Sequence, residues 1–153
     1  MKLLYLAYGS NLNLEQMKFR CQGAVVLGSI ILNNYRLVYK GSMDGAAHLT
    51  IEENEGSALP LGVFQISKED ELKLDRYEGY PYYYLKKYLL VNINNQPTKA
   101  LIYVMNPRYE YHLPSNIYVR TCMQGYKDFN FDQTILEEAL EFSKRERIKK
   151  LIK

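Results

Sequence analysis

The order of apolar segments along the chain most constrains what it can fold into. Short runs typical of β-strands lie at residues 2–8, 24–32, 35–40, 48–51, 59–66, 83–91 and 99–105. Helical patterns lie between and after them, at residues 12–20, 68–77, 116–123 and 132–152. Because strands and helices do not alternate regularly, this order favours an α+β fold with a mixed, curled sheet.

Length and composition predict one globular domain spanning residues 1–153. Domains of ~100–200 residues are the norm. Hydrophobic residues make up 47% of the chain and charged residues 24%, which excludes a disordered chain. Cys21 and Cys122 are too few for a disulfide framework, and His48 and His112 show no ligand spacing. We therefore expect no metal site.

Tyrosine is the unusual residue, with 15 copies against 5 phenylalanines and no tryptophan. Its ring is apolar, but its hydroxyl needs a partner when buried. Many of these tyrosines are expected in strands, where aromatic side chains fit the pleated surface. Others are expected to line a cavity whose walls carry polar tips.

No apolar run approaches the ~20 residues that cross a bilayer, and the N-terminal run ends at Gly9-Ser10-Asn11, too early for a signal peptide. These features predict a cytoplasmic protein with reduced thiols and no membrane partner. The net charge is +3, and residues 144–153 carry six basic side chains against Glu146. Such an end is typical of a solvated helix terminus, although it could also contact nucleic acid. We expect no nucleic-acid partner, because no recognised motif accompanies it.

Local signals predict where individual elements begin and end. Asn33-Asn34 is a turn dipeptide, so residues 24–32 and 35–40 are expected to form a hairpin. Ser67, followed three residues later by an acidic side chain, is typical of a helix N-terminal cap. The helix that follows is expected to stop at Gly79, a typical C-terminal glycine.

The first candidate for chemistry is Tyr8-Gly9-Ser10-Asn11-Leu12, between an expected strand and a short helix. Glycine permits positive φ, and successive backbone N–H groups in such a turn can converge on an anion. The plainer interpretation is an ordinary turn with a Ser or Asn cap. The segment is neither a P-loop nor a dinucleotide-binding fingerprint, because neither glycine spacing is present.

The second candidate is Glu78, which ends a helix and has tyrosines on both sides in sequence. A carboxylate there faces the negative end of the helix dipole, and aromatic neighbours can desolvate it. Both effects raise its pKa toward neutral pH, where a general acid/base is useful. The plainer interpretation is a surface glutamate beside an aromatic strand.

The third candidate is Pro114-Ser115-Asn116-Ile117-Tyr118, followed by Gly125. Taken alone, it predicts a capped helix with a tyrosine in the core. Other catalytic templates fail, because no GxSxG elbow is present and neither histidine lies in a nucleophile motif.

Together and in this order, these segments resemble the γ-glutamylcyclotransferase superfamily, including its AIG2-like members, over nearly the whole chain. The matching positions are Tyr8-Gly9-Ser10-Asn11-Leu12, Arg20-Cys21, Gly28, Tyr35-Arg36-Leu37, Gly62-Val63-Phe64, Leu74-Asp75-Arg76-Tyr77-Glu78-Gly79, Tyr84, Pro114-Ser115, Tyr118 and Gly125. The resemblance implies a small mixed β-barrel with surrounding helices. It also implies an enzyme that needs no metal and no organic cofactor.

The reaction that the resemblance implies is intramolecular acyl transfer on a small-molecule γ-glutamyl amide. The free α-amino group attacks the γ-carbonyl of the same molecule, which closes 5-oxoproline and releases an amine or amino acid. Glu78 matches the family's general acid/base. The backbone of Tyr8, Gly9, Ser10, Asn11 and Leu12 would hold the glutamyl carboxylate or the developing oxyanion.

The resemblance also places Tyr84 and Tyr118 in the pocket, where their hydroxyls would orient the substrate and Glu78. Tyr80, Tyr82 and Tyr83 follow Glu78 closely and are expected to shape the leaving-group side. The same chemistry could instead remove a γ-glutamyl protecting group from a metabolite. A further alternative is a non-catalytic small-molecule binding protein on the same fold. A monomer or a homodimer fits equally well.

Overall fold

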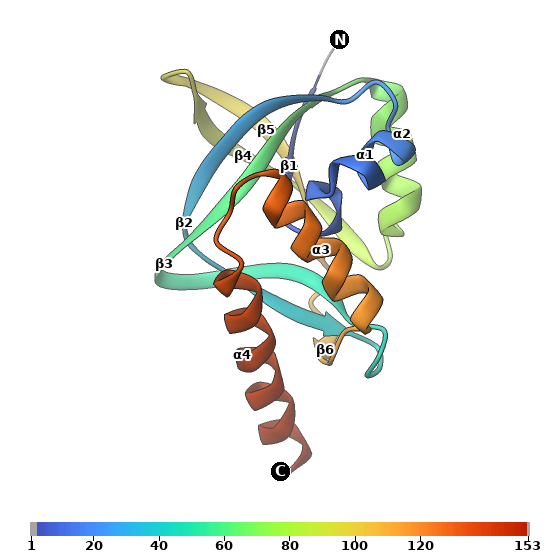
Figure 1. Ribbon diagram of the computed structural model, residues 1–153, viewed down its shortest axis with the longest axis vertical. Helices are drawn as coiled ribbons and strands as arrows, with labels where there is room; N and C mark the ends of the chain where they lie inside the picture. Colours follow the sequence, from blue (N-terminus) through green and yellow to red (C-terminus); the bar gives the residue numbers. More distant parts are fainter. Residues whose placement is uncertain (1–2, 153) are drawn as a thin grey trace.

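The computed structural model describes residues 3–152. Within them, one mixed sheet has the strand order β4-β5-β1-β3-β2-β6 and curls into a half barrel (Figure 1). The strands are β1 (Leu3–Ala7), β2 (Val25–Gly41), β3 (His48–Ile66), β4 (Tyr84–Ile93), β5 (Gln96–Met105) and β6 (Glu110–Tyr111). Strand β1 pairs antiparallel with β3 and parallel with β5, so the predicted mixed α+β architecture is confirmed.

The helices surround this sheet. They are the short 3₁₀ helix η1 (Ser10–Leu12), α1 (Leu14–Arg20), α2 (Lys68–Glu78), α3 (Asn116–Asp128) and α4 (Thr134–Leu151). The helix expected over residues 12–20 is thus divided into η1 and α1. Asn13 causes the division, because its extended backbone ends η1 and its side chain accepts a hydrogen bond from Gln16 N as the cap of α1.

The hairpin predicted at Asn33-Asn34 is wrong, because β2 runs through this point without reversing. Asn34 adopts a left-handed φ of 67°, and the pairing register with β3 shifts between Asn33 and Tyr35. Gly56 on β3 donates its N–H to the side chain of Asn34 at 3.0 Å. The turn dipeptide therefore makes a bulge in two long strands that stay paired, and they reverse only at residues 42–47.

The predicted helix ends are confirmed. Ser67 and Asp70 form a reciprocal capping box at the start of α2, and Gly79 ends that helix with φ 66°. Ser115 caps α3 by accepting a hydrogen bond from Tyr118 N at 3.1 Å. Both helices are thereby fixed at the ends that approach the site described below.

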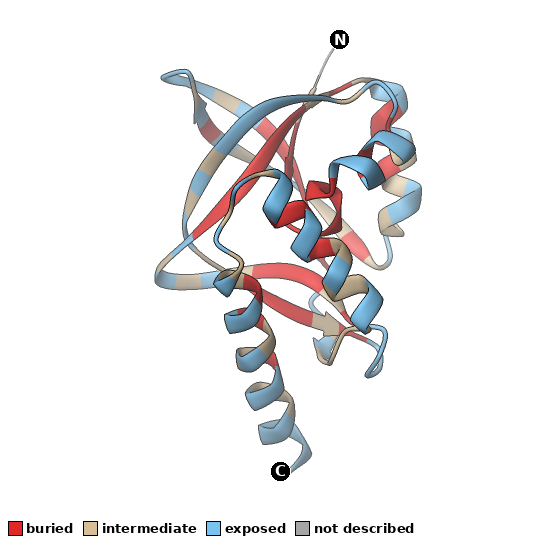
Figure 2. Cartoon of the chain, in the orientation of Figure 1, coloured by how far each residue is buried: buried red, intermediate tan, exposed pale blue. Residues whose placement is uncertain are grey.

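The core lies between the curled sheet and the helices, and α3 packs against η1 (Figure 2). A Cβ on Gly125 would lie 2.6 Å from the backbone N of Asn13, so only glycine lets α3 approach the chain after η1 this closely. Helix α4 lies against β2 through Ser143, which accepts a hydrogen bond from Tyr39 N at 2.9 Å.

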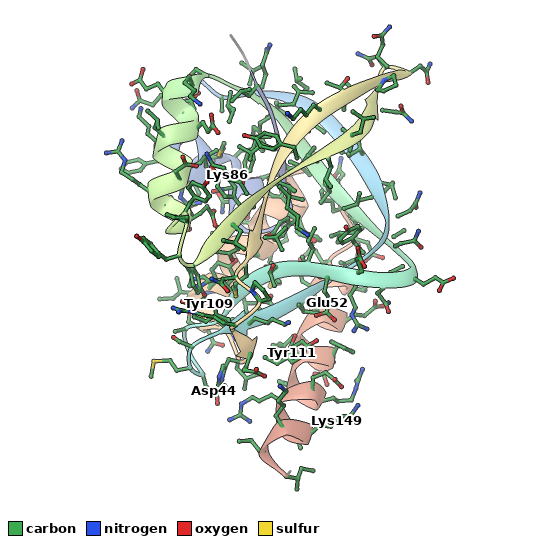
Figure 3. All side chains as sticks on the ribbon, turned by 180° about the vertical axis from the view of Figure 1, so that it is seen from behind. Asp44, Glu52, Lys86, Tyr109, Tyr111 and Lys149 are labelled. Atoms are coloured by element: carbon green, nitrogen blue, oxygen red, sulfur yellow. The ribbon has the colours of Figure 1, made fainter. Side chains whose placement is uncertain are left out.

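The C-terminal half of α4 extends away from the sheet, and its side chains are mostly exposed (Figures 1 and 2). Arg147 pairs there with Asp44 from the loop between β2 and β3, and Lys149 pairs with Glu146 at 2.8 Å (Figure 3). Part of the basic C-terminal charge is thus compensated within the chain. Within residues 3–152, no helix is both long and apolar enough to span a membrane.

Candidate active site

A cavity of about 140 Å³ lies where η1, the end of α2 and the start of β4 meet the sheet. Seven of the 15 tyrosines line it, namely Tyr5, Tyr8, Tyr77, Tyr83, Tyr84, Tyr103 and Tyr118. Glu78 is the one acidic side chain in its described lining, which contains no lysine or arginine. Nearly half of the tyrosines of the sequence therefore gather around a single polar-tipped cavity.

The structure brings nearly all the predicted site residues to this cavity. They come from three distant parts of the chain and comprise Tyr8, Gly9, Ser10, Asn11, Glu78, Tyr84 and Tyr118. Leu12 does not line the cavity. Its N–H donates to Gly9 O at 3.0 Å, and its side chain is fully buried beside Gly62.

The loop after β1 presents backbone donors to the cavity. The N–H groups of Gly9, Ser10 and Asn11 donate no hydrogen bond to any other residue between 3 and 152. Gly9 itself lies against Tyr118, because a Cβ at this position would be 3.3 Å from the Tyr118 hydroxyl. Unpaired N–H groups on one cavity wall can bind a carboxylate or stabilise an oxyanion.

Helix α2 positions Glu78 at its last turn, where Gly79 turns the chain back toward β4. Lys86 on β4 fastens that helix to the sheet, because its Nζ lies 2.8 Å from a carboxylate oxygen of Glu71 and 2.8 Å from one of Asp75 (Figure 3). Tyr103 adds a hydrogen bond from its hydroxyl to Asp75 at 2.6 Å. The end of α2 is therefore held against the cavity by both charge and hydrogen bonds.

The environment of Glu78 favours its protonated form. Burial raises the pKa of Glu78 from 4.5 to about 7, although the charge of Arg20 and a hydrogen bond from Asn11 oppose the rise. The Asn11 Nδ2–H group donates to Glu78 Oε1 over 3.4 Å. A carboxyl with a pKa near 7 can both accept and return a proton at neutral pH.

Three of the cavity tyrosines already donate their hydroxyl protons to protein acceptors, and one of them is Tyr103, which donates to Asp75 as described above. Tyr8 donates to Tyr103 O at 2.6 Å, and Tyr84 donates to Leu49 O at 2.6 Å. Burial also raises the pKa of Tyr84 well above its ordinary value, so its proton stays in place. These hydroxyls can accept hydrogen bonds from a ligand. They could donate to a ligand only by breaking their hydrogen bonds within the protein.

Two other tyrosine hydroxyls still have a proton to donate. Tyr118 accepts from Leu49 N at 3.1 Å, and Tyr5 accepts from Asn11 Nδ2 at 2.8 Å. Burial raises the pKa of both tyrosines, so both stay protonated at neutral pH. Tyr5 and Tyr118 are therefore the cavity tyrosines best placed to donate to a bound carbonyl or carboxylate.

Sequence reasoning missed several lining residues, and His48 is the clearest case. Its Nδ1 lies 2.7 Å from the Tyr83 hydroxyl, and its ring packs edge-on against Tyr118 with 4.8 Å between centroids. Burial lowers the pKa of His48, so its imidazole is neutral at pH 7. A lone histidine has no motif, and only the long β2–β3 pair brings it here. Tyr5, Leu49, Tyr77 and Tyr103 also line the cavity and were not predicted as site residues.

The tyrosines just after Glu78 divide between cavity and surface. Tyr83 lines the cavity, as expected. Tyr80 instead turns outward under Lys86, whose Nζ lies 4.6 Å from the ring centroid, and Tyr82 is 76% exposed. The expectation that all three shape the site is therefore wrong for Tyr80 and Tyr82, because the tight turn after Gly79 points successive side chains apart.

Metal-ligating side chains are not clustered in the part of the chain that the structure describes. No group of three or more His, Cys, Asp or Glu residues there could hold a metal ion. His48 and Glu78 both line the cavity. His48 is hydrogen-bonded to Tyr83, and Glu78 accepts a hydrogen bond from Asn11. The cavity thus combines one titratable carboxyl, that of Glu78, with backbone amide and tyrosine hydroxyl donors.

Comparison with known proteins yields one family and several similar folds. The model of the family described as "Gamma-glutamyl cyclotransferase, AIG2-like" matches residues 5–120. A solved structure of a protein called gamma-glutamyl cyclotransferase has a TM-score of 0.77 at 22% identity, covering 96% of this chain and 87% of that chain. No curated protein is a significant sequence match.

Two further solved structures share the fold. An uncharacterized human protein has a TM-score of 0.75 at 23% identity, covering 95% of this chain and 86% of that chain. The protein YkqA of Bacillus subtilis has a TM-score of 0.72 at 15% identity, covering 94% of this chain and 54% of that chain. At such low identities these structures establish the architecture alone.

Proposed function

The chain belongs to the γ-glutamyl cyclotransferase, AIG2-like family, and from that premise we propose that it releases 5-oxoproline and a free amine or amino acid from a small γ-glutamyl amide. One observation carries the proposal: Glu78, whose pKa is about 7, lines the same cavity as the unpaired N–H groups of Gly9, Ser10 and Asn11. An acid/base and an anion-binding loop are the two parts that this cyclisation needs from a protein.

The reaction begins with a proton transfer to Glu78. Its carboxylate takes a proton from the substrate's α-ammonium group, and the free amine attacks the γ-carbonyl carbon of the same molecule. A new C–N bond closes the five-membered ring while the carbonyl oxygen becomes an oxyanion. Holding both reacting groups within one molecule can supply about 7–11 kcal/mol of the barrier reduction.

The second half of the reaction breaks the original amide bond. The backbone N–H groups of Gly9, Ser10 and Asn11, together with the Tyr118 hydroxyl, are the donors available to the oxyanion and the α-carboxylate. The protonated Glu78 gives its proton to the departing nitrogen as the carbonyl reforms and the amide C–N bond breaks. The ring nitrogen then loses its second proton to the Glu78 carboxylate, which passes it to the released amine and is ready for the next cycle. Proton transfer by a positioned side chain typically contributes about 10²–10⁴-fold to the rate.

The size of the cavity limits what it can enclose. A cavity of about 150 Å³ holds one benzene-sized molecule, so about 140 Å³ suits a γ-glutamyl group but not a large amine as well. The leaving amine would extend toward the opening, where Tyr77 lines the cavity and is 45% exposed. This geometry supports a recognition mode that is strict for the glutamyl group and looser for the amine.

The test is detection of 5-oxoproline from a panel of γ-glutamyl compounds with alkyl, aryl and amino-acid leaving groups. We expect ring product from at least one class with the wild-type chain and almost none with Glu78→Gln. The alternative of a non-catalytic binding protein predicts that 5-oxoproline or a γ-glutamyl ligand binds without turnover of any panel member. Equal activity of both proteins would show that Glu78 is not the acid/base.

A further inference from the structure

Arg20 lies beside the cavity without lining it. It ends α1, is half-buried, and its guanidinium stacks on the Tyr77 ring with 3.6 Å to the centroid. Its Nη1 donates to Asn11 Oδ1 and, over 3.4 Å, to Ser10 Oγ, while its Nη2 donates to Gln16 Oε1 at 2.9 Å. Within residues 3–152 no carboxylate forms an ion pair with Arg20, so its contacts are with neutral groups of the anion-binding loop and its neighbours.

The bond from Arg20 decides which way the Asn11 amide points. Because Oδ1 faces the guanidinium, the NH₂ group must face the other way, where it donates to Tyr5 Oη at 2.8 Å and to Glu78 Oε1 at 3.4 Å. A flipped amide would place an oxygen against the Glu78 carboxylate and the NH₂ group against a cation. Arg20 excludes that orientation.

We infer that Arg20 is a positioning residue for the proposed reaction: by fixing the Asn11 amide, it holds Glu78 as proton acceptor and keeps the Tyr5 hydroxyl free to donate. The Asn11 NH₂ group occupies one Glu78 oxygen, which leaves Oε2 for the substrate ammonium. The same NH₂ group occupies an acceptor site of Tyr5, so the Tyr5 proton remains available. This inference rests on the proposed function for its rate effect but not for its structural effect.

The charges around Glu78 agree with this role. Arg20 and Asn11 are the two groups that lower the pKa of Glu78 against the effect of burial. The other titratable groups lining the cavity are the seven tyrosines, which come from the sheet, α2, α3, the loop after β1 and the turn before β4, together with neutral His48 on β3. Arg20 is therefore the cation whose removal should alter Glu78 most.

The experiment compares wild type, Arg20→Met, Arg20→Lys and, as a matched control, Lys18→Met. Lys18 lies on the same helix and is exposed. Glutamate labelled with ¹³C at the side-chain carboxyl reports the titration midpoint of Glu78 by NMR, and 5-oxoproline release gives kcat/KM against pH. Melting curves confirm folding, and the lysine variant serves if the methionine variant fails to fold.

For Arg20→Met we expect the Glu78 midpoint to rise by about one pH unit, and kcat/KM at pH 7 to fall by about 10–100-fold. Arg20→Lys keeps the positive charge but loses the planar guanidinium that holds Asn11. The titration midpoint of Glu78 should therefore move less in this variant, while kcat/KM should still fall. Adding Arg20→Met to Asn11→Ala should change kcat/KM by no more than about twofold when it is measured above both Glu78 midpoints, because there only the positioning effect counts and it acts through Asn11.

The inference is overturned if Arg20→Met behaves like Lys18→Met in both measurements, or if its loss adds fully to that of Asn11→Ala. A wild-type chain that releases no 5-oxoproline from any substrate refutes the proposed function instead. In that case the NMR titrations still test the effect of Arg20 on Glu78. A Glu78 midpoint that is unchanged in both Arg20 variants refutes the inference.

Discussion

The cavity has two walls of opposite character. The acid wall consists of Asn11, Tyr77 and Glu78, with Arg20 behind it, and carries the charges of the site. The aromatic wall consists of His48, Tyr83, Tyr84 and Tyr118, which are all neutral at pH 7. Under the proposed function, proton transfer belongs to the acid wall, while the aromatic wall shapes and orients the substrate.

Replacing Glu78 should have the largest effect on activity of any change in either wall. Glu78→Gln keeps the shape of the side chain and removes its titration, so we expect 5-oxoproline release to fall by about 10²–10⁴-fold. Glu69→Gln is a matched control on the same helix, because the Glu69 side chain is 80% exposed. A loss of similar size in both variants would point to damage to α2 rather than to lost acid/base chemistry.

The raised pKa of Glu78 should also make the free energy of unfolding depend on pH. Since folding raises the pKa of Glu78 from 4.5 to about 7, the unfolded chain ionises first as pH rises. The folded state therefore loses stability between about pH 4.5 and pH 7, by up to about 3 kcal/mol. Glu78→Gln, which cannot ionise, should be more stable than wild type at pH 8 and lose that advantage toward pH 4.5. Denaturant unfolding at both pH values measures this, and a pH-independent difference would contradict the raised pKa.

The aromatic wall depends on how closely α3 approaches the loop after β1. Gly125→Ala would put a Cβ 2.6 Å from Asn13 N and 2.7 Å from Leu12 C, so backbone must move. We expect about 1–3 kcal/mol of lost stability. Activity should fall as well, because Tyr118 moves with α3.

Gly45→Ala, on the loop before β3, is a contrasting variant: a Cβ there meets nothing within 4 Å, although the φ of 87° is itself strained. A fully active, equally stable Gly125→Ala chain would show that the two walls are independent.

The two walls also differ in how far the sequence predicts them. Glu78 and the loop at residues 8–12 lie in compact motifs next to helix signals, and these signals depend on local backbone physics. His48 has no local signal, because it reaches the cavity only through the pairing of β2 with β3 over long strands. The hairpin wrongly predicted at Asn33-Asn34 has the same origin: a local turn signal was overridden by pairing that spans the sheet.

Tyr118 and Tyr84 allow a finer test within the aromatic wall. Both hydroxyls bond to the backbone of Leu49, but Tyr118 accepts from its N–H while Tyr84 donates to its C=O. Replacing either tyrosine by phenylalanine should cost about 1 kcal/mol of stability. Only Tyr118→Phe removes a proton that a substrate can use, so kcat/KM should fall about 10-fold there and less than about twofold in Tyr84→Phe. The reverse order would show that the hydroxyl of Tyr84, not that of Tyr118, orients the substrate.

The smallest effect on kcat/KM is expected at Tyr82, which the sequence predicted near the site but whose side chain points to the surface. Tyr82 is 76% exposed and does not line the cavity, although it lies only four residues after Glu78. Tyr82→Ala should therefore leave kcat/KM within about twofold of wild type for small leaving amines, in line with the small effect of most surface changes. Tyr83→Ala, one position later, removes the partner of His48 and should raise KM clearly more. If Tyr82→Ala is the more damaging of the two, the leaving amine crosses the outer surface of the turn after Gly79, and the aromatic wall extends beyond the cavity.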